Sequence, residues 1–139
     1  KKKKKSYTKG SLQTRVAGAD PYQLVQMLMA GVLENLNYAK GAIQRKDLEK
    51  KSLYLSKAQA IVDSLRYSLD DTAGSDAAGN LRELYMYMST RIADASIELD
   101  TDIIDEVARL MLDIKGAWDQ IPMEQRDVAM SQMQQASGA

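Results

Sequence analysis

The stretch from residue 20 to residue 44, DPYQLVQMLMAGVLENLNYAKGAIQ, decides the fold. Asp20 is a strong helix cap because its carboxylate accepts hydrogen bonds from the free amides of a first turn, and Pro21 stands where no amide is needed. Gln23 follows the cap by three residues, as a capping box requires. The apolar positions behind this start are Val25, Leu28, Met29, Val32, Leu36, Ala39 and Ile43. Their spacing of three and four residues predicts an amphipathic helix that ends near Gln44.

Three further stretches carry the same kind of apolar repeat. We expect a second helix from the Asp47 cap to about Leu69, a third over residues 77–99, and a fourth that follows the break at 100–102 and stops at Pro122. The positions that we place in the core are Leu48, Leu55, Ala58, Val62, Leu65 and Leu69, then Leu81, Leu84, Tyr85, Met88, Ile92 and Ala95, then Ile103, Val107, Leu110, Met111, Ile114 and Trp118. Because short turns join the helices, the sequence predicts an all-α fold, an antiparallel up-down four-helix bundle.

Polar segments flank the predicted bundle. We expect a flexible N-terminal arm at residues 1–19, the bundle at 20–121, and a frayed or disordered tail at 122–139 with room for a short fifth helix. Without Lys1 to Lys5, 14 basic residues face 19 acidic ones, so the rest of the chain is acidic. Such a lysine run binds nucleic acid or anionic lipid, or is an added remnant or a solvated terminus. No aromatic or glycine pattern accompanies it, so we expect no nucleic-acid partner.

Composition excludes most catalytic chemistry. The 139 residues include no cysteine and no histidine, which excludes disulfides, thiolate nucleophiles, Cys/His zinc sites and imidazole bases. The aspartates near the predicted turns do not have the spacing of a calcium loop. We therefore expect a protein that is not an enzyme and that uses no cofactor or metal. No apolar run reaches the roughly 18–20 residues of a membrane span and no signal peptide opens the chain, so we expect a cytoplasmic protein without membrane insertion.

The first three predicted helices carry a second set of apolar or small residues, away from the core positions. These sets are Met27, Gly31, Tyr38 and Ala42 on the first helix, Leu53, Ala60 and Tyr67 on the second, and Met86, Ala93 and Ile97 on the third. The fourth helix has only Ala108 and Leu112 off its core stripe. Isolated apolar residues are common on protein surfaces, but aligned stripes on consecutive helices form grooves that bind partners. The pattern therefore predicts a docking platform for an amphipathic helical or extended peptide.

Several of these segments resemble those of one protein family. Residues 20–31 resemble the SP-x-x-L-x-x-ML-x-x-G opening of the flagellar secretion chaperone FliS family, with Asp20 in place of the serine. Residues 56–62 and 65–70 resemble the second helix of that family, and residues 80–95 resemble its NL-x-x-LY-x-YM-x-x-R third helix. Residues 105–107 with Ala117 and Trp118 resemble the fourth. The resemblance covers about residues 7–121 and keeps all four helices in order.

The resemblance implies a function for the docking platform. Members of this family hold the disordered C-terminal segment of flagellin in the cytoplasm, prevent its premature polymerisation, and deliver it to FlhA, the export gate of the flagellar type III system. The family also implies that Tyr7, upstream of the first helix, takes part in docking to the cytoplasmic domain of FlhA, and that a co-chaperone is a further candidate partner. The residues that we then expect to bind flagellin are Met27, Gly31, Tyr38, Leu53, Ala60, Tyr67, Met86, Ala93 and Ile97.

Two other functions remain open on the sequence alone. The bundle is also compatible with a helical adaptor for a different secretion or signalling client, which uses the same docking surface. A nucleic-acid or membrane binder would instead work through Lys1 to Lys5, and its binding would depend strongly on salt. The choice of client is the question that the residue pattern leaves unanswered.

Overall fold

Four long helices account for most of the residues that the structure describes. The computed structural model describes residues 20–69 and 76–126. Its helices are α2 (Pro21–Gln44), α3 (Leu48–Tyr67), α4 (Asp76–Glu98) and α5 (Thr101–Asp119), and one helical turn follows at residues 123–126. The two described ranges contain no β-strand. The predicted all-α bundle with a short fifth helix is therefore confirmed.

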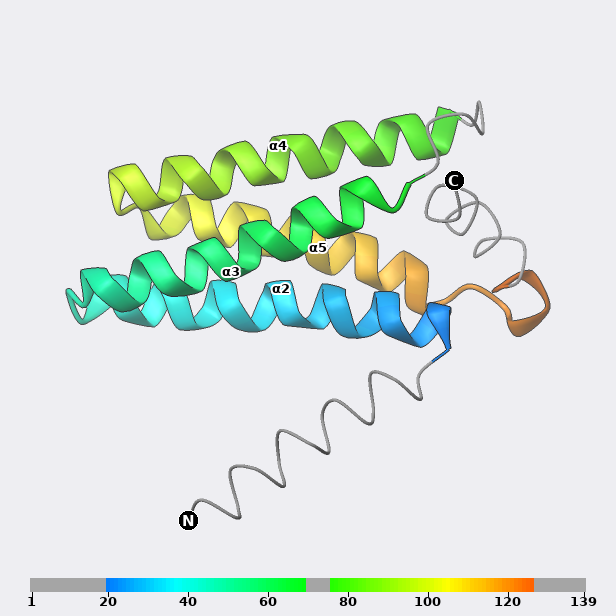
Figure 1. The fold of residues 1–139 in the computed structure, drawn as a ribbon, viewed down its shortest axis with the longest axis horizontal. Helices are drawn as coiled ribbons and strands as arrows, with labels where there is room; N and C mark the ends of the chain where they lie inside the picture. Colours follow the sequence, from blue (N-terminus) through cyan, green and yellow to red (C-terminus); the bar gives the residue numbers. More distant parts are fainter. Residues whose placement is uncertain (1–19, 70–75, 127–139) are drawn as a thin grey trace, which may run out of the picture.

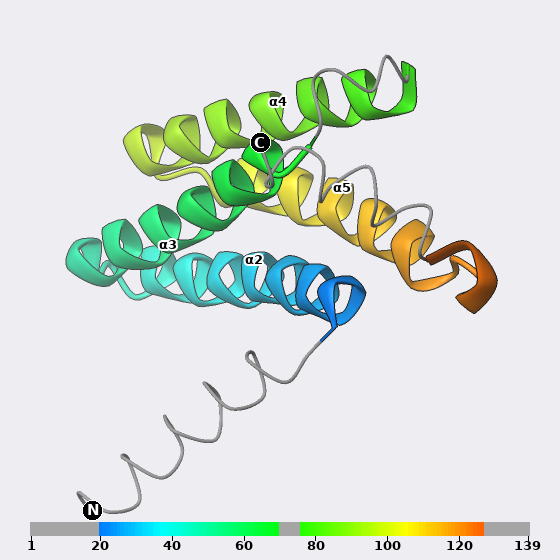
Figure 2. The same ribbon diagram turned by 45° about the vertical axis from the view of Figure 1, so that its right-hand side comes forward.

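The four helices form a closed ring. Each helix runs antiparallel to the one before it, and α5 returns to pack against α2 (Figure 1). The turns between α2 and α3 and between α4 and α5 lie at the same end of the bundle. From their shared turn, α4 and α5 diverge toward their other ends (Figures 1 and 2). This arrangement places α3 between α2 and α4, and it leaves one long side of α3 facing outward.

The helix starts follow the predicted caps. The Gln23 amide donates to Asp20 Oδ1 at 2.7 Å and the Gln23 side chain accepts from the Asp20 amide at 3.4 Å, which completes the capping box. In the same way, Asp47 accepts from the amide of Lys50 at 3.1 Å and Asp100 accepts from the amide of Asp102 at 2.9 Å. These caps satisfy first-turn donors that would otherwise lack partners.

The core follows the predicted stripes at most positions. Its fully buried side chains include Met29, Val32 and Leu36 of α2, Leu55 and Val62 of α3, Tyr85, Met88 and Ile92 of α4, and Ile104, Val107 and Met111 of α5. Leu48 was expected in the core and is 52% exposed, because it is the first residue of α3 and lies at the end of the bundle. Ala42 was expected on the second stripe and is fully buried. The chain folds back over it, as the Asp47 amide donates to the Ala42 carbonyl at 2.8 Å.

A buried lysine ties α3 to the end of α4. Lys51 is 9% exposed, and its ammonium donates to the backbone carbonyl of Ser96 at 3.1 Å and to the Ser96 hydroxyl at 3.3 Å. The last turn of α4 has no basic residue of its own. Because unpaired carbonyls make a helix C-terminus electronegative, the Lys51 charge stabilises this end of α4.

Aromatic packing closes the opposite end of the bundle. The rings of Tyr22 and Trp118 stack with centroids 5.1 Å apart, and the Arg126 guanidinium lies 4.2 Å from the Tyr22 centroid. The Tyr22 hydroxyl donates to the Trp118 carbonyl, and the indole donates back to the Tyr22 carbonyl at 3.3 Å. These contacts join the first turn of α2 to the last turn of α5 and hold the helical turn at 123–126 against both.

Candidate functional site

The outward side of α3 carries an apolar row. Leu53 is 48% exposed and Tyr67 is 72% exposed, and Ala60 lies exposed between them. The three are seven residues apart, which is two helical turns, so they share one side of the helix. The opposite side of α3 holds Ala58 and Val62, both fully buried. The helix is therefore apolar on two sides, and only one of them is needed for the core.

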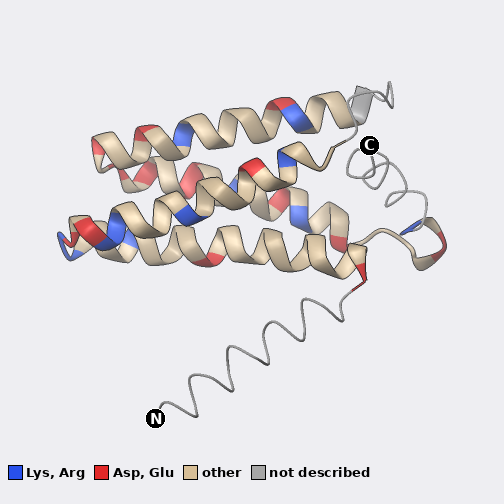
Figure 3. Ribbon diagram, viewed as in Figure 1, with Lys and Arg blue, Asp and Glu red and all other residues tan. Residues whose placement is uncertain are grey.

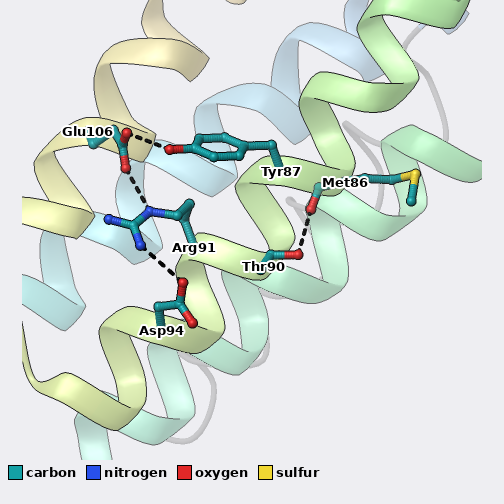
Figure 4. Close-up of polar contacts among 6 residues, drawn as sticks. All are labelled: Met86, Tyr87, Thr90, Arg91, Asp94 and Glu106. Atoms are coloured by element: carbon teal, nitrogen blue, oxygen red, sulfur yellow. Dashed lines mark hydrogen bonds and ion pairs between the residues drawn. The ribbon is translucent and has the colours of Figure 1, made fainter.

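The outward side of α4 continues this apolar surface. Met86 is 48% exposed and Ile97 is 81% exposed, with Ala93 half-buried between them. Ser89 lies on the same flank, and its carbonyl accepts from the amide of Gln59 of α3 at 2.9 Å, so this flank of α4 borders α3. Figure 4 shows Met86 pointing away from the side of α4 that carries Tyr87. Met86, Ala93 and Ile97 thus line the seam between α3 and α4.

The predicted residues of α2 lie on the other flank of α3. The Tyr38 ring packs against Tyr54 of α3 with centroids 5.2 Å apart, and the Tyr38 hydroxyl donates to Glu34 Oε1 at 2.9 Å. This hydrogen bond, together with the charge of Glu34, raises the pKa of Tyr38. Gly31 also faces α3, since a methyl group in place of its hydrogen would lie 3.2 Å from Ile61 Cδ1. Close helix packing is therefore one reason for a glycine at this position.

We call these nine residues the open face: Met27, Gly31 and Tyr38 of α2, Leu53, Ala60 and Tyr67 of α3, and Met86, Ala93 and Ile97 of α4. The α2 and α4 members border α3 on its two sides. Met27 and Gly31 are half-buried. Each of the nine was expected to bind a partner, and each lies on α3 or on a flank of α2 or α4 beside it. Their role in binding stays a prediction.

Polar contacts cross the seam between α4 and α5 instead. Tyr87 donates to Glu106 Oε2 at 2.7 Å, and Arg91 donates to Glu106 Oε1 at 2.9 Å and to Asp94 at 3.0 Å (Figure 4). The hydrogen bonds from Tyr87 and Arg91 lower the pKa of Glu106, and the bond to Glu106 raises the pKa of Tyr87. This network favours the ionised carboxylate and links the two helices.

The seam between α2 and α5 is bridged in the same manner. The Lys40 ammonium lies 2.9 Å from Asp105 Oδ1, and the Gln26 amide donates to Asp119 at 2.8 Å. Lys115 pairs with the same Asp119 at 2.7 Å and lowers the pKa of that carboxyl. We call the two seams of α5 the bridged face. It was not expected from the sequence, because the partners lie 15 to 93 residues apart.

Charge is distributed unevenly over the bundle. Basic residues gather at the turn between α2 and α3 and on the first half of α3, and acidic residues gather at the turn between α4 and α5 (Figure 3). In the described ranges there is no group of three or more acidic side chains placed to hold a metal ion. None of the helices in those ranges has the length and apolar character to cross a bilayer. Tyr7, expected to dock to an export gate, lies outside the described residues.

Two further residues belong beside the open face although the sequence reasoning did not select them. Tyr54 is half-buried against Tyr38, and a pairing of aromatic residues across two helices has no local signal. Thr90 is exposed one turn beyond Met86, and its hydroxyl donates to the Met86 carbonyl at 3.1 Å. Its position four residues after Met86 is a signal that would have found it.

Comparison with known proteins assigns the bundle to a family. The family model described as flagellar protein FliS matches residues 3–125. The chain belongs to the FliS family. It is 41% identical over 117 residues to the flagellar secretion chaperone FliSB of Pseudomonas aeruginosa, and the aligned residues cover 84% of this chain and 93% of that protein. It is 38% identical over 128 residues to the flagellar secretion chaperone FliS of Vibrio cholerae, covering 92% and 94%. The FliS chaperone of Bacillus subtilis is 34% identical over 116 residues, covering 83% and 86%. The resemblance inferred from the motifs is thus confirmed, and FliS proteins are chaperones rather than enzymes.

Proposed function

We propose that this FliS-family chain is an export chaperone that binds the C-terminal segment of flagellin in the cytoplasm, prevents its premature polymerisation and delivers it to FlhA. The observation that carries the proposal is the open face. Exposed apolar side chains that gather on one side of a folded domain mark partner-binding surfaces, and the open face brings such side chains together from three helices. The relatives are named secretion chaperones, and a chaperone needs a surface that holds a client without reacting with it.

The chemistry of the open face suits a client that is disordered when free. Leu53, Tyr67 and Ile97 offer large apolar contacts, and the small side chain of Ala60 lets a client backbone approach α3 closely. A segment that folds on binding gives up part of its interaction energy to ordering, so it covers a wide surface and still dissociates. This balance favours stoichiometric binding followed by release at the export gate.

The direct test is a titration of the full chain with a synthetic peptide of its cognate flagellin C-terminal segment. We expect a one-to-one complex, a gain in peptide helicity measured by circular dichroism, and suppression of flagellin polymerisation at equimolar chaperone. No heat of binding and unchanged polymerisation would contradict the proposal. A pull-down from a flagellated lysate that enriches another protein in place of flagellin would favour the adaptor for a different client.

Delivery to the gate is the second half of the proposal. We propose that Tyr7 docks to the cytoplasmic domain of FlhA, as the family resemblance implies. Tyr7→Ala should then reduce co-purification of the FlhA domain with the flagellin-loaded chaperone and leave the affinity for the flagellin peptide unchanged. Equal recovery of the FlhA domain by the wild type and the variant would contradict this role.

A further inference from the structure

An unpaired cation lies within the apolar row of α3. Lys57 is exposed, and the four residues at helical spacing from it, Leu53, Tyr54, Ala60 and Ile61, are all apolar or aromatic. The sequence therefore places no carboxylate next to Lys57 on its own helix. On the facing flank of α2, Glu34 accepts the hydroxyl of Tyr38 instead.

The lack of a partner sets Lys57 apart from the cations of the bridged face. There, Lys40, Arg91 and Lys115 each lie within 3.0 Å of a carboxylate. In residues 20–69 and 76–126, Lys57 has no ion pair or side-chain hydrogen bond, and the same is true of Lys50, Lys46 and Arg45. These four exposed cations lie within 13 positions of each other, from the turn between α2 and α3 to the middle of α3, the stretch where basic residues gather (Figure 3).

Two of these cations, Lys50 and Arg45, each line a hollow in the surface. One of about 510 Å³ is lined by Lys50, Leu53 and Ser56 among others. A second of about 480 Å³ lies across the α2–α3 hairpin and is lined by Tyr38, Arg45 and Tyr54 among others. Both hollows thus combine an unpaired cation with an aromatic or aliphatic member of the open face or its neighbour.

We infer that the client segment on the open face is an amphipathic helix with a carboxylate over Lys57, apolar side chains one turn to either side, and further carboxylates toward Lys50 and Arg45. This inference rests on the proposed function and adds the chemistry of its client. An unpaired cation within an apolar surface discriminates between clients. A client that covers Lys57 without offering a carboxylate removes water from the ammonium and gives no ion pair in return, so it binds more weakly. Opposite charge in that position also fixes the register of the bound helix.

A peptide fits this surface better than a polyanion does. Glu49 lines the first hollow next to Lys50, and the cap residue Asp47 lines it as well. These carboxylates repel the continuous negative charge of an anionic bilayer, whereas a helix with discrete carboxylates avoids them. We therefore assign the basic end of α3 to an acidic amphipathic segment.

The test compares two charge reversals in the full-length chain. Lys57→Glu removes the proposed pair, and Arg109→Glu makes the same change of charge at an exposed position of α5. The probe is the flagellin C-terminal peptide, with a second version in which each Asp and Glu is replaced by Asn and Gln. Affinities are measured by calorimetry in 50 mM and 500 mM NaCl, which are about threefold apart in screening length.

We expect Lys57→Glu to weaken binding about fivefold or more at low salt, with a smaller loss at high salt, while Arg109→Glu changes it less than about twofold. The neutralised peptide should bind the wild type more weakly and bind Lys57→Glu no worse than the native peptide does. Equal effects of the two reversals would overturn the inference and leave the proposed function intact. Absence of binding to the wild type would overturn both. Loss of sedimentation with phosphatidylglycerol vesicles in Lys57→Glu, at unchanged peptide affinity, would assign the cations to a membrane and overturn the inference.

Discussion

The bridged face and the open face are two sides of one small bundle, and they differ in polarity: ion pairs join the helices on the first, and apolar side chains are exposed to water on the second. Across the seams of α5, Glu106, Asp105 and Asp119 each hold a partner on a neighbouring helix. On the outward side of α3 and the neighbouring flank of α4, the exposed large hydrophobic side chains are Leu53, Tyr67, Met86 and Ile97, and none of these four is charged. The polar contacts that Lys51 and Gln59 of α3 make with α4 include backbone carbonyls of Ser96 and Ser89.

This difference indicates where a partner binds at least cost. An apolar partner that covers the bridged face must strip water from several ion pairs, and the energy of those pairs barely offsets their desolvation. A partner on the open face removes apolar surface from water, which contributes about 25 cal/mol for each Å². The same bundle thus uses one side for its own cohesion and keeps the other available.

The largest effect should come from placing one charge on either side of α3. Ala58 is fully buried and Ala60 is exposed, two residues apart on the same helix. Ala58→Glu should destabilise the bundle by about 4 kcal/mol or more, because it buries an unpaired carboxylate. Ala60→Glu should change the free energy of unfolding by less than about 0.5 kcal/mol and abolish binding of the flagellin peptide.

Urea unfolding monitored by circular dichroism measures the free energy of unfolding, and calorimetry measures the affinity for the flagellin peptide. Ala93→Glu, on the half-buried flank of α4, should behave like Ala60→Glu in binding. Wild-type affinity in a folded Ala60→Glu variant would show that the partner does not use the outward side of α3.

A smaller effect is expected from the lysine beneath the open face. Lys51→Met keeps the aliphatic stem and removes the ammonium that donates to the Ser96 carbonyl. We expect a loss of about 1–2 kcal/mol, typical of a hydrogen bond from a charged group to a part-buried carbonyl, with little change in affinity for the peptide. Chemical denaturation measures the loss. An unchanged midpoint would mean that this bond adds nothing to the cohesion of α3 and α4.

The smallest effect, and the one that depends on pH, is expected on the bridged face. The folded structure lowers the pKa of Glu106 below the ordinary value of 4.5, first through Tyr87 and then through Arg91. A lowered carboxyl pKa stabilises the fold above the unfolded pKa, and the contribution disappears as the pH falls through the folded one. Glu106→Gln should therefore be less stable than the wild type at pH 7, and the difference should shrink as the pH falls below 4.5. A constant difference in melting temperature from pH 7 to pH 3 would contradict this assignment.

The extent to which the sequence predicts this molecule differs between its local and its distant contacts. Caps such as Asp20 and Asp47 and the spacing of the apolar residues are local, so the helices and most of the core followed from them. The burial of Tyr22 did not, because the ring that covers it belongs to Trp118, 96 residues away. Ile104 is fully buried beside the predicted stripe of α5, since α5 packs against α2 as well as α4. The sequence indicated the open face through a second set of regularly spaced apolar residues that the core does not need. The ion pairs that cross the seams of the bridged face join residues on different helices, so no local pattern predicts them.

The most direct test of the central claim is photo-cross-linking at two matched positions. Ile97 on the open face and Leu112 on α5 are both exposed aliphatic side chains, 81% and 55% accessible, and each can be replaced by benzoylphenylalanine in the full chain. With flagellin added at equal concentration, we predict a cross-linked complex from position 97 and only background from position 112. Cross-linking from position 112 with none from position 97 would show that flagellin binds the bridged face, and would contradict the account.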